Sequence, residues 1–236
     1  ITGPNGAGKT TLLLAIMGLP PARIVSGDIR WLGQSILDLD TTQRVELGLG
    51  MAFQRPPAIP GLKLRRLAEL IVTKRLQKLA GSEDGKLLQQ ARCTIEQAAT
   101  ELGVADLLDR DVNEGFSGGE LKRSEIFQLA LQQPRLFLLD EPESGVDVEN
   151  IRRIGGMLRK LLQRDLCPPD RQVCGLIITH SGFILEYVNA DRAHVLFDGR
   201  LICSGSPTDV FEHIQDLSLI HISEPTRPRL ISYAVF

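Results

Sequence analysis

The chain alternates short apolar runs with longer segments of helical periodicity. Apolar runs at 136–139 (LFLL) and 173–179 (VCGLIIT) have the length of buried strands, and polar residues follow each run. Helical patterns cover 11–18 (TLLLAIMG) and run from about Glu120 to Leu131 (ELKRSEIFQLAL). At 236 residues the chain is long enough for one large α/β domain, or for a core with a smaller lobe.

Composition narrows the range of partners. A net charge of -2 shows no basic excess of the kind that neutralises a nucleic-acid backbone, so we expect no nucleic-acid partner. The longest apolar runs fall well short of the ~20 residues that a membrane helix requires, and no signal-peptide pattern opens the chain. We therefore expect a cytoplasmic protein without a membrane span. The four cysteines lack metal-site spacing and are expected to be reduced thiols: Cys93, Cys167, Cys174 and Cys203.

Both ends of the chain depart from the pattern. The chain begins at ITGPNGAGKTT, in the last residues of an expected strand, which predicts that N-terminal strands of the domain are missing. Residues 217–236 (LSLIHISEPTRPRLISYAVF) continue neither a helical nor a strand pattern and resemble translated sequencing-adapter read-through. An ordinary disordered tail is the alternative. We expect a native domain over 1–216 and exclude 217–236 from the functional argument.

The first motif is GPNGAGKT at 3–10, which fits the phosphate-loop pattern G-x-x-x-x-G-K-[ST]. Its glycines allow backbone N–H groups to surround phosphate oxygens, while Lys9 neutralises phosphate charge and the Thr10 hydroxyl ligates Mg²⁺. This pattern is loose enough to arise by chance in about one chain in a hundred of this length. The alternative is therefore a glycine-rich turn that only caps a helix. The predicted nucleotide-binding residues here are Gly3, Pro4, Asn5, Gly6, Ala7, Gly8, Lys9, Thr10 and Thr11.

A second motif, PRLFLLDEPESGVD at 134–147, supports the phosphate-loop interpretation. An apolar strand ends there in two adjacent acids, and the carboxyl edge of a parallel sheet is where such folds bind ligands. Asp140 is predicted to hold Mg²⁺, and Glu141 to act on the attacking water as general base. The alternative is that these acids only begin a polar turn, as Pro142 and Gly145 favour. The agreement of two ordered motifs reduces that alternative to below about one in ten.

A third motif combines a helix start with two glycines. Ser117 and Glu120 form a capping-box pattern, which accounts for both residues. It leaves Gly118 and Gly119 unexplained, and each glycine costs about 1 kcal/mol in a helix. A helix N-terminus with N–H groups and a serine hydroxyl is also an anion site. Because the chain already has one phosphate loop, we expect these residues to cap the γ-phosphate held by a second copy, in a head-to-tail dimer.

Together, the motifs resemble those of the ATP-binding cassette (ABC) ATPases over essentially all of 1–216. Five segments carry the resemblance, namely GPNGAGKTT, FSGGE, LFLLDEP, SGVD and LIITH. The resemblance implies an ABC-type P-loop NTPase core, an α/β fold with a mostly parallel sheet, and an inserted α-helical subdomain at about 61–116. It also implies ATP hydrolysis, with ATP and Mg²⁺ as cofactors.

The resemblance gives roles to three further positions. Gln54 in MAFQRPP matches the family's Q-loop glutamine, which touches Mg²⁺ and senses the partner surface. Asp147 lies in the segment that matches the loop crossing to the other subunit. His180 matches the histidine that contacts the γ-phosphate, whereas by itself it would be interpreted as a capped strand end or a core histidine. The predicted catalytic residues are therefore Glu141, His180 and Gln54, and the predicted metal-binding residues are Thr10, Gln54 and Asp140.

Residues 55–113 carry mostly helical patterns, at 62–79, 85–104 and 105–111, and are expected to form the lobe that docks a partner. This lobe is too short for the long coiled coils of DNA-repair members of the family. Its basic residues are expected to form a solvated face: Lys63, Arg65, Arg66, Lys74, Arg75 and Lys78.

Within the family, the motifs of this sequence are most similar to those of the ATPases of the Suf iron–sulfur cluster assembly system. MAFQRPPAIPG and NEGFSGGELKRSEIFQLAL carry this likeness, since transporter members usually read L-S-G-G-Q there. It implies soluble SufB/SufD-like scaffold partners and a second copy of the chain in the ATP-bound state. The wording DEPESGVD and THSG departs from the Suf pattern, so the nucleotide-binding subunit of an ABC membrane transporter is the alternative. A regulatory module with little hydrolysis is disfavoured by the intact Asp140, Glu141 and His180.

Overall fold

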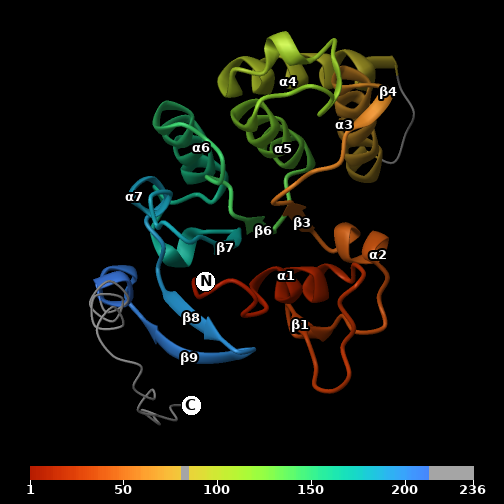
Figure 1. The fold of residues 1–236 in the computed structure, drawn as a ribbon. Coiled ribbons are helices and arrows are strands. Elements are labelled where there is room, and N and C mark those ends of the chain that lie inside the picture. The colour runs from red at the N-terminus through yellow and green to blue at the C-terminus, as the bar shows by residue number, and fades with distance from the viewer. Residues whose placement is uncertain (81–84, 213–236) are drawn as a thin grey trace.

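The computed structural model describes residues 1–80 and 85–212, and its centre is a parallel sheet of three strands in the order β3-β6-β7 (Figure 1). These strands cover Leu49–Ala52 (β3), Leu136–Asp140 (β6) and Cys174–Ile178 (β7). Both pairings are parallel, so the three carboxyl ends lie at one edge of the sheet. The predicted read-through at 217–236 lies outside the described residues.

The first residues of the chain join this sheet to a hairpin. The amide of Thr179 donates to the carbonyl of Ile1 (3.1 Å), and Thr2 forms an isolated parallel bridge with Val195. The hairpin consists of β8 (Ala193–Phe197) and β9 (Arg200–Gly205), which pair antiparallel. Ile1 and Thr2 therefore occupy a strand position between β7 and β8, directly before the glycine-rich loop.

Helices cover both faces of the sheet. The α-helices are α1 (Lys9–Met17), α2 (Thr41–Glu46), α3 (Leu64–Ala80), α4 (Gly85–Leu102), α5 (Gly118–Gln132), α6 (Val148–Leu161) and α7 (Leu185–Val188), and two 3-10 turns are η1 (Ala105–Leu107) and η2 (Pro168–Asp170). Two short antiparallel pairs complete the described elements: β1 (Arg30–Trp31) with β2 (Gln34–Ser35), and β4 (Ile59–Lys63) with β5 (Asp111–Val112). The predicted α/β fold with a mostly parallel sheet is confirmed.

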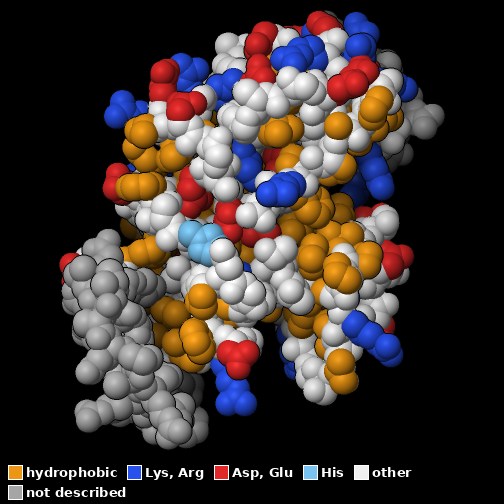
Figure 2. All heavy atoms as spheres, in the orientation of Figure 1, with side chains coloured by type: hydrophobic (Ala, Val, Ile, Leu, Met, Phe, Trp, Pro, Cys, Tyr) orange, Lys and Arg blue, Asp and Glu red, His pale blue; other side chains and the backbone are white. Residues whose placement is uncertain are grey.

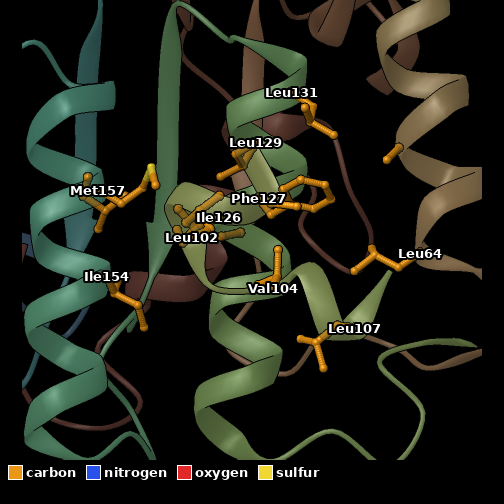
Figure 3. Close-up of a cluster of buried hydrophobic side chains, with 14 of the residues drawn as sticks. Leu64, Leu102, Val104, Leu107, Ile126, Phe127, Leu129, Leu131, Ile154 and Met157 are labelled. Atoms are coloured by element: carbon orange, nitrogen blue, oxygen red, sulfur yellow. The ribbon is translucent and has the colours of Figure 1, made fainter. Parts of the chain in front are cut away.

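Alternating side chains of β6 separate two apolar cores. Leu138 points into a cluster that includes Leu13 and Met17 of α1, whereas Phe137 and Leu139 belong to the larger cluster beneath the other helices. The larger cluster contains buried side chains of α3 to α6, with Phe127 fully buried at its centre (Figure 3). The sheet is thus held from both faces, which fixes the edge where β6 and β7 end.

The helical lobe holds α3 and α4, which pack with α5 above the sheet (Figure 1). One prediction for this lobe is wrong, because only Ala105–Leu107 of the segment 105–111 is helical, as a single 3-10 turn. The chain then extends into β5, since the Asp111 carboxylate accepts the N–H of Gly61 (2.8 Å) and pairs with Lys63 Nζ (2.7 Å). These contacts join the segment that leads into the lobe to the segment that leads out of it.

A second correction concerns the basic face of the lobe. Lys74 and Lys78 are exposed, as expected, and Arg66 pairs with Glu69 at the surface. Arg75 is instead directed inward: its guanidinium donates to the carbonyl of Leu131 (2.7 Å), and burial lowers its pKa. The carbonyls in the last turn of α5 lack helical partners, which is why a cation binds there.

Candidate active site

The glycine-rich loop begins directly after Thr2 and ends at α1. Gly8 caps α1 in the left-handed conformation (φ 95), and a side chain on Gly3 (φ 145) would overlap the carbonyl of Leu196. Lys9 is buried at the start of the helix, and its Nζ donates to the carbonyls of Gly3 (2.8 Å) and Pro4 (2.9 Å). Burial lowers the pKa of Lys9, and the charges of Glu141 and Asp140 oppose that shift. The lysine therefore sits between the loop and the acids that follow β6.

The end of β6 places Asp140 next to α1. Its side chain is buried, and its Oδ2 accepts the Thr10 hydroxyl at 2.9 Å. Burial raises the pKa of Asp140, with the Thr10 hydrogen bond opposing and the charge of Glu141 adding to the shift. Its second oxygen, Oδ1, has no hydrogen-bond partner among the described residues. Such an oxygen is suited to an additional ligand.

Glu141 receives two side chains, one on each carboxylate oxygen. Gln54 Nε2 donates to Oε2 at 2.7 Å, and His180 Nε2 lies 2.7 Å from Oε1. The three residues follow β3, β6 and β7, so the carboxyl edge of the sheet brings them together. Glu141 also has a positive φ of 49, a conformation that non-glycine residues adopt mainly where a site requires it.

These contacts define a group of predicted site residues that we call the catalytic cluster, which consists of Lys9, Thr10, Gln54, Asp140, Glu141 and His180. Glu141 and His180 open into a cavity of about 600 Å³. Figure 2 shows acidic side chains gathered in the middle of this face, below the helical lobe. Of the remaining predicted loop residues, Asn5, Gly6 and Thr11 are exposed beside the cluster, and Ala7 is buried.

The residues of the third motif, which begins at Ser117, form a second cluster. Ser117 caps α5 through the expected capping box: its Oγ accepts the Glu120 N–H (3.3 Å), and its own N–H donates to Glu120 Oε2 (2.7 Å). The helix therefore begins at Gly118, two residues before the predicted start. A side chain on Gly118 would overlap the carbonyl of Gly145. This close approach within the chain itself explains why position 118 requires glycine.

Asp147 lies on the same side, beside Gly119. It caps α6, accepting the N–H of Asn150 at 3.0 Å and its amide group at 2.6 Å, and a side chain on Gly119 would approach the Asn150 amide. We call these residues the signature cluster: Ser117, Gly118, Gly119, Gly145, Asp147 and Asn150. The predicted site residues thus separate into two groups, each assembled within the chain.

Known proteins share these motifs. A protein-family profile described as ABC transporter matches residues 1–144. A "Probable ATP-dependent transporter ycf16" of Pyropia yezoensis is 35% identical over 208 residues, covering 88% of this chain and 80% of the relative. The chain belongs to the ABC family. It is an ATP-binding ATPase of the ABC type, which confirms the resemblance inferred from its motifs.

Further relatives of this ABC ATPase carry different names. "Probable ATP-dependent transporter SufC" of Escherichia coli is 34% identical over 212 residues, covering 88% of this chain and 81% of the relative. A "Probable ABC transporter ATP-binding protein" of Streptococcus pyogenes is 38% identical over 208 residues, covering 87% and 76%. The Suf-like motifs and the transporter-like motifs of the sequence thus both have counterparts among the names of its relatives.

Solved structures share the fold. An ATP-binding cassette of an ABC transporter superimposes with a TM-score of 0.69 at 22% identity, covering 95% of this chain and 87% of the other. A dimeric ATP-binding cassette bound to ADP and Pi gives a TM-score of 0.68 at 23% identity, covering 87% and 83%. Within residues 1–80 and 85–212, every helix of this ABC ATPase falls short of the length and apolarity needed to cross a bilayer.

Two residues without a predicted role lie behind Gln54. Lys122 is buried, and its Nζ donates to the carbonyls of Phe53 (2.8 Å) and Gln54 (3.0 Å). Glu125 is also buried and accepts the Phe53 N–H at 3.1 Å. Burial raises the pKa of Glu125 to about 7, against the effects of the Phe53 N–H and of Lys122. Both side chains hold the backbone that carries Gln54.

A pattern in the sequence could have revealed this pair. Lys122, Glu125, Ile126 and Leu129 repeat at helical spacing, so they lie on one face of α5. Ile126 and Leu129 are buried in the core, and two charges on a core-facing stripe require partners. Spacing alone does not name those partners, because they come from a loop that lies about seventy positions earlier in the chain.

Proposed function

We propose that two copies of this ABC ATPase enclose ATP in a head-to-tail dimer and couple its hydrolysis to conformational change in a Suf-type iron–sulfur cluster assembly scaffold. One observation carries the dimer: among the described residues, no hydrogen bond or ion pair joins Ser117–Gly119 to the phosphate loop, and the N–H groups of Gly118 and Gly119 have no acceptor. Two phosphate-binding groups that do not meet within one chain can meet between two.

In this proposal the catalytic cluster performs the hydrolysis. Lys9 neutralises charge on the β- and γ-phosphates, and Glu141 takes the proton of the water that attacks the γ-phosphorus, while the bond from that phosphorus to the β–γ bridging oxygen breaks and ADP leaves. Gln54 and His180 fix the direction of the Glu141 carboxylate, and His180 also faces the γ-phosphate. Ser117, Gly118 and Gly119 of the second copy donate to the γ-phosphate oxygens, so removal of that phosphate releases the dimer.

The polar atoms at the end of β6 fit Mg²⁺. Asp140 offers a buried oxygen without a hydrogen-bond partner among the described residues, and the Thr10 hydroxyl lies next to it. The Gln54 amide uses its nitrogen toward Glu141, which leaves its oxygen as a ligand. Hydroxyl, amide and carboxylate oxygens are the hard ligands that Mg²⁺ prefers, so Thr10, Gln54 and Asp140 would hold the ion. Bound there, it would neutralise charge on the transferred phosphoryl group.

The Suf assignment rests on helix α5 and the residues directly before it. The segment FSGGE followed by K-R-x-E-I resembles the Suf ATPases, and its Lys122 and Glu125 are the two residues that hold Phe53 and Gln54. The relative named SufC supports the same assignment. The partners are then SufB/SufD-like scaffold subunits in the cytoplasm. The alternative, a transporter subunit, is supported by the relative named an ABC transporter ATP-binding protein.

The dimer is tested with Glu141→Gln. This change keeps the shape of the side chain and removes the base, so we expect phosphate release to fall by a factor of about 100 to 10,000 while ATP remains bound. Size-exclusion chromatography with ATP should then show accumulation of a dimer, and the same protein with ADP serves as control. A variant that binds ATP yet stays monomeric contradicts the shared site.

The scaffold is tested by co-purification of the tagged protein from its own cells, with and without detergent. Soluble SufB/SufD-like subunits that elute in both preparations support the proposal. A membrane subunit that elutes only in detergent supports the transporter alternative, and leaves the ATPase assignment unchanged.

A further inference from the structure

The carboxylate of Glu143 lies buried in the loop that follows Glu141, at 8% exposure. Burial raises the pKa of this group. The proposed hydrolysis gives it no task, and within the part of the chain that the structure describes no hydrogen bond or ion pair joins its carboxylate to the phosphate loop or to the signature cluster. A buried acid destabilises a fold unless donors compensate its oxygens, so its partners indicate why it is there.

The partners of Glu143 are the two residues that flank His180. The hydroxyls of Thr179 and Ser181 both donate to Glu143 Oε1, the latter at 3.3 Å. The Thr179 hydroxyl also accepts the N–H of Gly182 at 2.9 Å, which fixes the turn after His180. One carboxylate oxygen thus holds the backbone on both sides of the histidine.

The same loop is attached to Glu141. The N–H of Ser144 donates to the carbonyl of Glu141 at 3.1 Å, so residues 141–144 form a turn that carries both acids. His180 contacts Glu141 through its imidazole, while Glu143 contacts the hydroxyls beside His180. The two loops therefore meet twice, once through the catalytic side chains and once through a contact that sets their spacing.

We propose that Glu143 is a positioning residue for His180. This inference rests on the proposed role of His180 at the γ-phosphate. By accepting both hydroxyls, Glu143 fixes the backbone from which the imidazole projects, and so the distance from Nε2 to Glu141 and to the phosphate. A misplacement of about 1 Å in such a group can cost about 100-fold in rate.

The test is a double-mutant cycle on steady-state ATP hydrolysis. Glu143→Ala is expected to lower kcat by about 10- to 100-fold with KM for ATP within about twofold, because binding of the nucleotide uses other residues. Glu143→Gln, whose amide oxygen accepts the same hydroxyls, is expected to stay within about threefold of the parent. In a His180→Ala background, Glu143→Ala should lower kcat no further, since there is no imidazole left to position.

Three outcomes overturn the inference. The first is an equal loss from Glu143→Ala with and without His180, and the second is a Glu143→Gln protein as slow as Glu143→Ala, which makes charge the cause. The third is a Glu143→Ala protein as fast as the parent. If Glu143→Ala does not fold, Thr179→Val, which removes the hydroxyl at nearly constant volume, enters the same cycle with the same criteria. A fully active His180→Ala protein instead refutes the role proposed for His180.

Discussion

The catalytic cluster and the signature cluster are built in different ways. In the catalytic cluster, side chains from three separate strand ends bind one another, and buried charges support them from behind. In the signature cluster, Ser117 caps α5 and Asp147 caps α6, so each of these two side chains satisfies its own helix end. The two parts of the signature cluster meet where Gly118 approaches the Gly145 carbonyl and where the Asn150 side chain accepts a hydrogen bond from Arg123 of α5.

For the proposed dimer, the difference indicates which half of the site is arranged within a single copy. The catalytic cluster has its proposed base, its lysine and its proposed metal ligands already arranged around the end of β6. The signature cluster presents helix N–H groups without an acceptor in the described part of the chain, which is a preformed surface rather than a complete site. Changes in the first cluster should therefore act on ATP directly, and changes in the second should act on stability and on the dimer.

The largest effect is expected from Lys9→Ala. It removes the cation that is proposed to make charge-assisted hydrogen bonds with the phosphates of ATP. Because such bonds are worth about 1.5 to 3 kcal/mol each, ATP affinity should fall by about 1000-fold. Isothermal titration with ATP measures this change. Lys74→Ala, at an exposed lysine of α3, is the matched control and should bind like the parent. Similar affinities for the two variants would remove Lys9 from the nucleotide site.

The buried support of the catalytic cluster should appear in the pH dependence of stability. The pKa of Glu125 is about 7 in the fold against an ordinary 4.5, so the folded state keeps a proton that the unfolded chain loses. Stability from this group is full below pH 4.5, falls as the pH rises toward 7, and is constant above. The fall amounts to about 3 kcal/mol.

Glu125→Gln cannot lose a proton, so this part of the pH dependence should disappear. Urea unfolding between pH 4.5 and 8 measures the difference in the free energy of unfolding between variant and parent. Glu149→Gln, at an exposed carboxylate of α6, is the control and should leave the dependence unchanged. Parallel curves for Glu125→Gln and the parent would mean that Glu125 is ionised throughout.

The two glycines of the signature cluster should behave differently. Gly118→Ala forces the α5 start away from the Gly145 carbonyl, and such overpacking costs about 2 kcal/mol. Gly119→Ala meets the Asn150 side chain rather than backbone and gains helix propensity, so it should cost less stability than Gly118→Ala. If a phosphate oxygen approaches Gly119, its variant still loses ATPase activity. Thermal unfolding with phosphate release separates the two, and a fully active Gly119→Ala protein contradicts the approach.

Much of the catalytic cluster could be predicted because its residues come in local motifs. The loop at 3–10 and the acids after 136–139 each identify a turn next to a strand, and a parallel sheet brings such turns to one edge. Gln54 and His180 were placed there by family resemblance, and their contacts with Glu141 agree with it. The capping box of Ser117 and Glu120 was readable for the same reason, since it spans only four residues.

What could not be predicted depends on contacts between distant segments. The glycine at 118 was explained only by a phosphate, because nothing in the sequence places Gly145 against it. Arg75 was predicted to be one of several surface cations, but its guanidinium binds the carbonyl of Leu131 at the end of α5. The segment 105–111 carries a helical pattern, but the Asp111 carboxylate binds Gly61 and Lys63 in a strand pair. In each case a tertiary contact overrides a local preference.

The smallest effect, and the most selective one, comes from comparing two capping boxes. Ser117→Ala and Asp40→Ala each remove a cap of similar geometry, on α5 and on α2, and each should cost about 1 kcal/mol of stability. If Ser117 served only as a cap, neither change would affect hydrolysis. Because Ser117 is proposed to donate to a phosphate on a second copy, Ser117→Ala should also lower kcat, by about tenfold, while Asp40→Ala should not. Equal kcat values for the two variants, at saturating ATP, would reduce Ser117 to a helix cap.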